Sequence, residues 1–207
     1  STQLHFIPNQ GSSRVDFTNQ SIQPVDFTIS SSENILVTDV NKDGLVDLLV
    51  GKTTGALQYW KNTGPEGTLD FSLEDDSFLE LGSTVLRQNI ACSVSDFDGD
   101  GKSDLVYGDQ NGRLNIIGNF REASNVVDAI TELTFNPLSG IYEARNLGGR
   151  IWPAAVNLFG STKPAIVVGN VLGGISILRH DEGESLPETL TIEIYPNPVA
   201  WDAALTI

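Results

Sequence analysis

Two acidic segments of the chain carry oxygen-bearing side chains at spacings that suit a metal-binding loop. They are DVNKDGLVD, residues 39–47, and DFDGDGKSD, residues 96–104. In both, Asp or Asn occupies positions 1, 3, 5 and 9, and position 6 is Gly. Side-chain oxygens at positions 1, 3 and 5 and a carbonyl at position 7 wrap a loop around one hard cation, and about six to eight oxygens suit calcium better than magnesium. The sequence therefore predicts two calcium sites.

The predicted ligands alternate with residues that point away from the ion. They are Asp39, Asn41, Asp43, the Leu45 carbonyl and Asp47 in the first site, and Asp96, Asp98, Asp100, the Lys102 carbonyl and Asp104 in the second. The alternative is that these side chains only cap solvated turns, as Asp and Asn often do. Four such groups in one loop would repel one another without a cation, which favours the metal site.

Two other calcium modules contain similar loops. An EF-hand has Glu at position 12 and helical flanks, whereas Val50 and Tyr107 occupy that position here and the flanks resemble strands. A dockerin module shares the phrase DVNKDG but continues into a helix, which LVDLLVG does not predict. Neither module accounts for the two segments.

A third segment, NLFGSTKPA, residues 157–165, aligns with the two acidic loops but lacks their carboxylates. It keeps Asn157 and has Phe159, Ser161 and Ala165 at the other ligand positions. We expect it to bind no metal. Because the third repeat is expected to fold without an ion, calcium in the other two is better explained as a structural element than as a direct participant in ligand binding.

The three loops belong to a repeat that organises the chain. Asp39, Asp96 and Asn157 are spaced by 57 and 61 residues. Each is followed 12 and 16 residues later by Gly, giving the pairs Gly51 and Gly55, Gly108 and Gly112, and Gly169 and Gly173. An apolar strand follows, with Leu57, Leu114 and Ile175 in equivalent places. The N-terminal LHFIPNQGSSRVDF matches LQYWKNTGPEGTLDF when Leu4 is placed on Leu57, so the chain begins within a repeat.

Each repeat is predicted to contain four short strands, which in the first complete copy are NILVTD, DLLVG, ALQYWKN and LDFSLE. These runs of Val, Ile, Leu and aromatic residues between Gly, Asn and Asp turns indicate an all-β fold. Four-stranded units of this length are typical of β-propeller blades, and Gly-x-x-x-Gly predicts a tight hairpin. About three and a half blades cannot close a ring, so we expect a longer protein or a partner to cover the open faces.

The segments VTDVNKDGLVDLLVG and VSDFDGDGKSDLVYG, each followed by Gly-x-x-x-Gly-x-Leu, resemble FG-GAP/VCBS repeats. This resemblance extends over residues 1–180. It implies calcium-loop blades like those of integrin α heads, in a secreted or cell-surface protein that binds ligands or surfaces. The calcium loops in that family are structural.

A second resemblance lies at the end of the chain. After a linker at residues 181–191, IYPNPV in residues 192–207 resembles the start of the β-sandwich-like C-terminal sorting domain of Bacteroidetes proteins. It implies that Tyr195 to Val199 begin an address for the type IX secretion machinery, and export across the outer membrane. The alternative is an ordinary Pro-rich linker and strand.

Composition excludes some functions and leaves others open. The formal net charge is −15, which disfavours partners such as nucleic acid or anionic lipid. No apolar run approaches the roughly 18 residues of a membrane span. The chain has no Met, which indicates a processed or trimmed piece, and its one Cys92 is predicted in a buried strand. Trp60 and Trp152 are expected in the core.

No catalytic residue is predicted. His5 and His180 are in different repeats, and neither adjoins a plausible Ser or Cys nucleophile. We therefore expect a binding or adhesion module rather than an enzyme. The alternative is the propeller portion of a secreted carbohydrate-active enzyme resembling polysaccharide lyases, and a third possibility is a structural spacer.

Overall fold

The computed structural model describes residues 1–9, 11, 13–17, 21–123 and 129–180, and this part of the chain is all-β, as predicted. Its strands are β1 (Thr2–Phe6), β2 (Gln23–Ile29), β3 (Asn34–Thr38), β4 (Asp47–Gly51), β5 (Leu57–Asn62), β6 (Phe71–Asp75), β7 (Ala91–Ser95), β8 (Asp104–Gly108), β9 (Leu114–Ile117), β10 (Thr134–Asn136), β11 (Ile141–Glu143), β12 (Trp152–Val156), β13 (Ala165–Gly169) and β14 (Ile175–Leu178). In these residues the one helical element is a 3₁₀ turn, η1 (Phe78–Glu80). None of the helical structure described is long and apolar enough to cross a bilayer.

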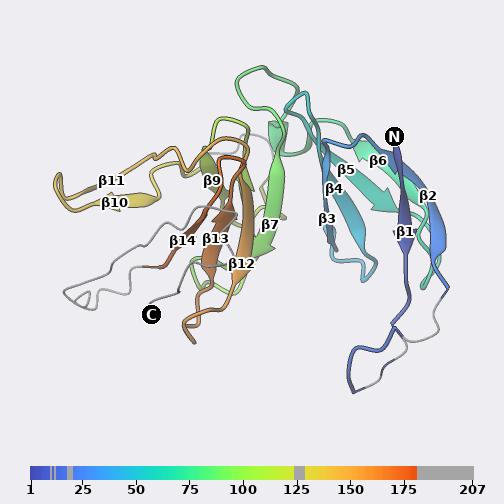
Figure 1. Cartoon of the computed structure of the whole chain (residues 1–207). Coiled ribbons are helices and arrows are strands. Elements are labelled where there is room, and N and C mark those ends of the chain that lie inside the picture. Colours follow the sequence, from blue (N-terminus) through green and yellow to red (C-terminus); the bar gives the residue numbers. More distant parts are fainter. Residues whose placement is uncertain (10, 12, 18–20, 124–128, 181–207) are drawn as a thin grey trace, which may run out of the picture.

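The strands form small antiparallel sheets in chain order. We call β3-β4-β5-β6 blade 1, β7-β8-β9 blade 2 and β12-β13-β14 blade 3. Hairpins β1-β2 and β10-β11 form two further sheets. Figure 1 shows the β1-β2 hairpin beside blade 1, and blades 2 and 3 following in turn. Face-to-face packing of successive small sheets is the arrangement expected of a β-propeller-like fold.

Apolar side chains on both faces of the middle strands of blades 1 and 2, β4 and β8, hold the sheets together. Because side chains alternate along a strand, β8 packs Leu105 and Tyr107 against blade 1 and Val106 against blade 3. The cluster between blades 1 and 2 also contains Leu49, Leu57, Tyr59, Ile90, Ile117 and Phe120. Val25 and Phe27 of β2 pack in the same way against Leu48 and Val50. The core is therefore a series of interfaces between sheets.

The prediction of four strands in every repeat holds only for blade 1 among the residues described. In the second repeat Ile130 makes an isolated bridge to Ile116 instead of a full fourth strand. The turn at Asn136 to Gly140, with Gly140 at φ 70°, then folds the chain back so that β10 pairs with β11. The predicted linker, 181–191, and the predicted sorting segment, 192–207, lie outside the described residues.

The two glycines of Gly-x-x-x-Gly have different roles. The second glycine adopts positive φ, 92° at Gly55 and 76° at Gly112, which confirms the predicted tight turn. The first is required by a close approach between blades. A Cβ at Gly51 would lie 1.9 Å from the backbone oxygen of Ile90, whereas a Cβ at Gly169 would have nothing within 4 Å.

This difference provides a matched pair of substitutions. Gly51→Ala should lower the free energy of unfolding by about 1–3 kcal/mol, because the chain at Ile90 must shift to admit the methyl group. Gly169→Ala, at the equivalent place in blade 3, should change it by less than about 1 kcal/mol. Urea denaturation of both variants measures this, and equal losses would contradict the role assigned to Gly51.

The two tryptophans differ in environment. Trp60 packs edge-on against Phe27 with ring centroids 5.0 Å apart, as a core residue should. The core prediction for Trp152 is wrong, because this residue is 37% exposed. Its Nε1 donates to Oδ1 of Asn34 at 2.8 Å, and the Arg150 guanidinium lies over its ring. Trp152 thus links blade 3 to blade 1 through a polar contact.

The environment of Cys92 agrees with its predicted place in a strand. It lies in β7, half-buried beside the cluster between blades 1 and 2. Burial raises the pKa of its thiol to about 12. The thiol is therefore protonated at neutral pH, which suits a structural residue.

Candidate metal-binding loops

The two acidic segments form equivalent loops in neighbouring blades. The first connects β3 to β4 and the second connects β7 to β8. Position 1 of each loop, Asp39 or Asp96, follows the first strand of its blade, and position 9, Asp47 or Asp104, begins the second. Register in these strand pairs therefore brings both ends of the loop together, with Thr38 paired to Asp47 and Ser95 to Asp104.

Side chains of the first loop accept hydrogen bonds from its own backbone. Oδ2 of Asp39 accepts from the Gly44 amide at 3.0 Å, Oδ1 of Asn41 from the Asp43 amide and Oδ1 of Asp43 from the Leu45 amide, both at 2.9 Å. Positive φ at Gly44, 88°, completes the curl. The loop thus turns its oxygens inward while satisfying its amides.

The second loop repeats this pattern. Asp96 accepts from the Gly99 amide at 2.7 Å and the Gly101 amide at 2.9 Å. Asp98 accepts from the Asp100 amide at 3.0 Å, and Asp100 from the Lys102 amide at 2.8 Å. The two loops share a conformation because they share the spacing of Asp, Asn and Gly.

Position 9 is a buried carboxylate that ties the loop to the sheet. Asp47 is fully buried, and its oxygens accept from the Val40 amide at 3.0 Å, the Asn62 amide at 2.9 Å and the Tyr59 hydroxyl at 3.2 Å. Burial is the larger cause of a raised pKa at Tyr59, and the charge of Asp47 is the next. The Tyr59 hydroxyl therefore stays protonated and can donate to Asp47.

Asp104 has the equivalent role in the second loop. It is 1% exposed and accepts from the Phe97 and Asn119 amides, both at 2.8 Å. Sequence reasoning missed the partners Asn62 and Asn119. The signal was available, because they lie 23 residues after Asp39 and Asp96 in the same repeat frame.

The second loop gathers three carboxylates. Ligand oxygens of Asp96, Asp98 and Asp104 all lie within 4.8 Å of one another, and no other such group of three occurs in the part of the chain that the structure describes. Backbone hydrogen bonding from Lys102 lowers the pKa of Asp100 and so favours its ionised form. An all-oxygen, anionic donor set fits a hard cation such as calcium.

A different observation indicates a cation site in the first loop. Oδ1 of Asp39 is shielded from solvent and has no hydrogen-bond partner, and such an atom is costly to bury unpaired. A cation beside it would satisfy it. The amide of Asn41 donates to Oδ2 of Asp43 at 2.8 Å, and Lys61 Nζ lies 3.8 Å from the same oxygen. This loop is therefore the less anionic of the two.

Two side chains after β9 connect the loops. Arg121 donates from Nε to the Asp39 carbonyl at 3.0 Å and also bonds the Ser103 hydroxyl. Glu122 pairs with Lys102 at 2.8 Å, and its carboxylate lies 4.0 Å from Lys42. The two loops thus lie at one end of adjacent blades and are cross-linked across the interface, a contact that sequence spacing did not predict.

The third loop lacks side-chain oxygens at two of the four positions. Phe159, at position 3, is 52% exposed, and Ala165, at position 9, is buried at the start of β13. Asn157 at position 1 is exposed. That this loop binds no metal stays a prediction.

Comparison with known proteins agrees with the repeat. Residues 39–107 match a family model described as FG-GAP-like repeat. The match begins at position 1 of the first loop and includes all of the second, so the resemblance found in the sequence is confirmed for this region. No curated protein and no solved structure matches the chain.

Proposed function

We propose that this chain is a calcium-stabilised, propeller-type binding or adhesion module of a secreted or cell-surface protein. The observation that carries the proposal is the convergence of Asp96, Asp98 and Asp104 in a loop within an FG-GAP-like repeat. Repeats of this kind occur typically in extracellular and cell-surface proteins, where calcium is abundant.

Calcium has a structural role in this proposal. Its ligands would be the five groups predicted for each loop, from Asp39 to Asp47 and from Asp96 to Asp104. The ion supplies positive charge that offsets the repulsion among clustered carboxylates. Because Arg121 bonds both the first loop and Ser103, ordering either loop also stabilises the interface between blades 1 and 2.

Export by the type IX route is a separate part of the proposal. It rests on IYPNPV in residues 194–199, which lie outside the described residues. Deleting residues 192–207 should retain the protein within the cell. Unchanged appearance in the medium would contradict the assignment.

Isothermal titration of calcium into metal-free protein tests the metal sites. We expect two sites, with the second loop binding more tightly because it holds more carboxylates. Asp98→Ala should remove one site, whereas Asp26→Ala, which removes an exposed carboxylate from β2, should remove none. A stoichiometry of three, or none, would contradict the assignment.

A further inference from the structure

The third loop encloses a cationic hollow at the place where the other two loops hold carboxylates. The hollow has a volume of about 240 Å³ and is lined by Phe159, Ser161, Lys163, Ala165, Arg179 and His180. Two replacements in the repeat account for it. Ala165 stands where Asp47 and Asp104 stand in the other blades, and His180 stands where Asn62 and Asn119 stand.

The cationic side chains of the hollow are held in place. Lys163 Nζ lies 3.4 Å from Nε2 of His180, and the Arg179 guanidinium lies 5.5 Å from the ring centroid of Phe159. The stem of Lys163 lies against the second loop, since a Cβ on Gly99 would be 3.0 Å from its Cε. That loop carries four carboxylates, and a calcium ion in it would offset about half of their negative charge.

The two cations of the hollow, Lys163 and Arg179, form no ion pair within the described residues. Within them the ion pairs involve Lys42, Lys52, Lys61 and Lys102, and neither Lys163 nor Arg179 has an acidic partner. The chain as a whole has a net charge of −15, so the positive charge of these two side chains is confined to this part of the molecule. Charges elsewhere on the surface are screened beyond roughly 8 Å at physiological salt.

We infer that this hollow binds the oxyanion group of an acidic polysaccharide, either a sulfate or a uronic carboxylate. Arg offers a planar fork of donors that matches such groups, and Lys offers a point charge. The inference builds on the proposed binding function, because it names the chemical class of the ligand.

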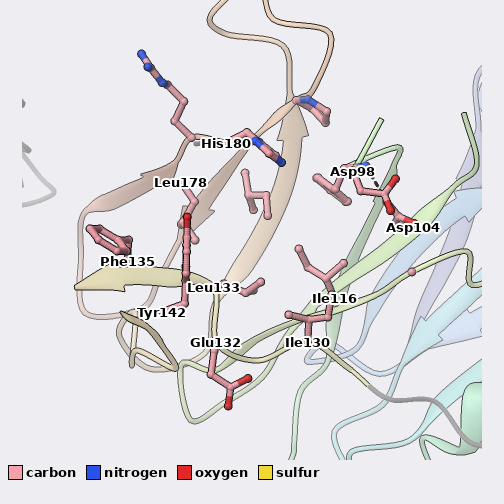
Figure 2. Close-up of a pocket in the computed structure, with 15 residues that line it drawn as sticks. Asp98, Asp104, Ile116, Ile130, Glu132, Leu133, Phe135, Tyr142, Leu178 and His180 are labelled. Atoms are coloured by element: carbon pink, nitrogen blue, oxygen red, sulfur yellow. Dashed lines mark hydrogen bonds between the residues drawn. The ribbon is translucent and has the colours of Figure 1, made fainter. Parts of the chain in front are cut away.

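A neighbouring cavity provides room for the sugar ring. It has a volume of about 380 Å³, shares Arg179 and His180 with the hollow, and is also lined by the carboxylates of Asp98, Asp104 and Glu132. Phe135 and Tyr142 from the β10-β11 hairpin border it, with ring centroids 5.4 Å apart, opposite His180 (Figure 2). Aromatic side chains with a few polar groups at the rim are typical of small-ligand sites.

Nuclear magnetic resonance titration of the full chain tests the anion site, with sodium sulfate as probe and sodium chloride at equal ionic strength as reference. We expect saturable shifts at residues 159–163 and 179–180. Binding should weaken at least tenfold in Lys163→Gln/Arg179→Gln and stay unchanged in the control Arg113→Gln, an exposed arginine in the turn before β9. No saturable shift, or equal binding in the double variant, would overturn the inference.

Oligosaccharides then identify the source of the oxyanion. A sulfated or a uronic oligosaccharide should bind more tightly than sulfate alone, and the neutral parent oligosaccharide should not bind. Sulfate binding without any gain from the sugar would overturn the polysaccharide assignment. Calcium titration of Lys163→Gln/Arg179→Gln should still give two sites, so loss of the anion site and failure of the calcium proposal are separate results.

Discussion

Replacing Asp47 by Ala is expected to lower the free energy of unfolding by roughly 3–5 kcal/mol. The carboxylate is fully buried and accepts from two backbone amides and the Tyr59 hydroxyl. Its removal leaves buried donors at Val40 and Asn62 unpaired, and each costs about 1–3 kcal/mol. Urea denaturation followed by circular dichroism measures the change.

Two controls separate this hydrogen-bonding role from calcium binding. Tyr59→Phe removes one donor while keeping the packed ring, so it should cost only about 1 kcal/mol. Repeating the comparison in chelator removes any contribution from the ion. A loss below about 1 kcal/mol for Asp47→Ala in chelator would show that Asp47 acts only as a metal ligand.

The strands of blade 1 could be predicted because they depend on local pattern. NILVTD, DLLVG, ALQYWKN and LDFSLE coincide with β3, β4, β5 and β6 to within one or two residues at their ends. Short apolar runs between turn-forming residues determine such elements almost independently of the rest of the chain. Alignment of the repeats then predicted the corresponding strands of blades 2 and 3, of which three are present in the described residues of each.

The departures from prediction depend on contacts between distant segments. Gly51 is required by the approach of Ile90, 39 residues further on. Trp152 is exposed because its indole reaches Asn34 of another blade. In the described residues of the second repeat, Ile130 makes only an isolated bridge to Ile116, and the hairpin at 134–143 pairs with itself. None of these follows from periodicity, which describes one element at a time.

In the two acidic loops, too, some features follow from local sequence and others depend on contacts between distant segments. Their conformation follows from Asp, Asn and Gly spacing, which the sequence displays. The anchoring of Asp104 by the Asn119 amide and the bridge from Arg121 to Asp39 require the blades to be placed first. The repeat frame aligns Asn62 with Asn119, a signal that the sequence prediction missed, and it does not say which atoms meet.

Removing calcium should lower the melting temperature by roughly 10–20 °C. Binding only to the folded state adds about 2.7 kcal/mol per site when calcium exceeds its dissociation constant a hundredfold, and about 1 kcal/mol shifts the melting temperature of a chain of this size by roughly 2–4 °C. Without the ion, the clustered carboxylates of Asp96, Asp98 and Asp104 repel one another within 4.8 Å.

Scanning calorimetry in calcium and in chelator measures this shift, and Asp98→Ala divides it between the sites. That variant should lose about half of the shift or more, because the second loop holds the denser cluster, while its melting temperature in chelator should stay at or above that of the unsubstituted chain. The reason is that removing one of three mutually repelling charges relieves the metal-free state while it destroys the site. A melting temperature that does not depend on calcium would contradict the structural role of the ion, and a full shift retained in Asp98→Ala would place the stabilising ion elsewhere.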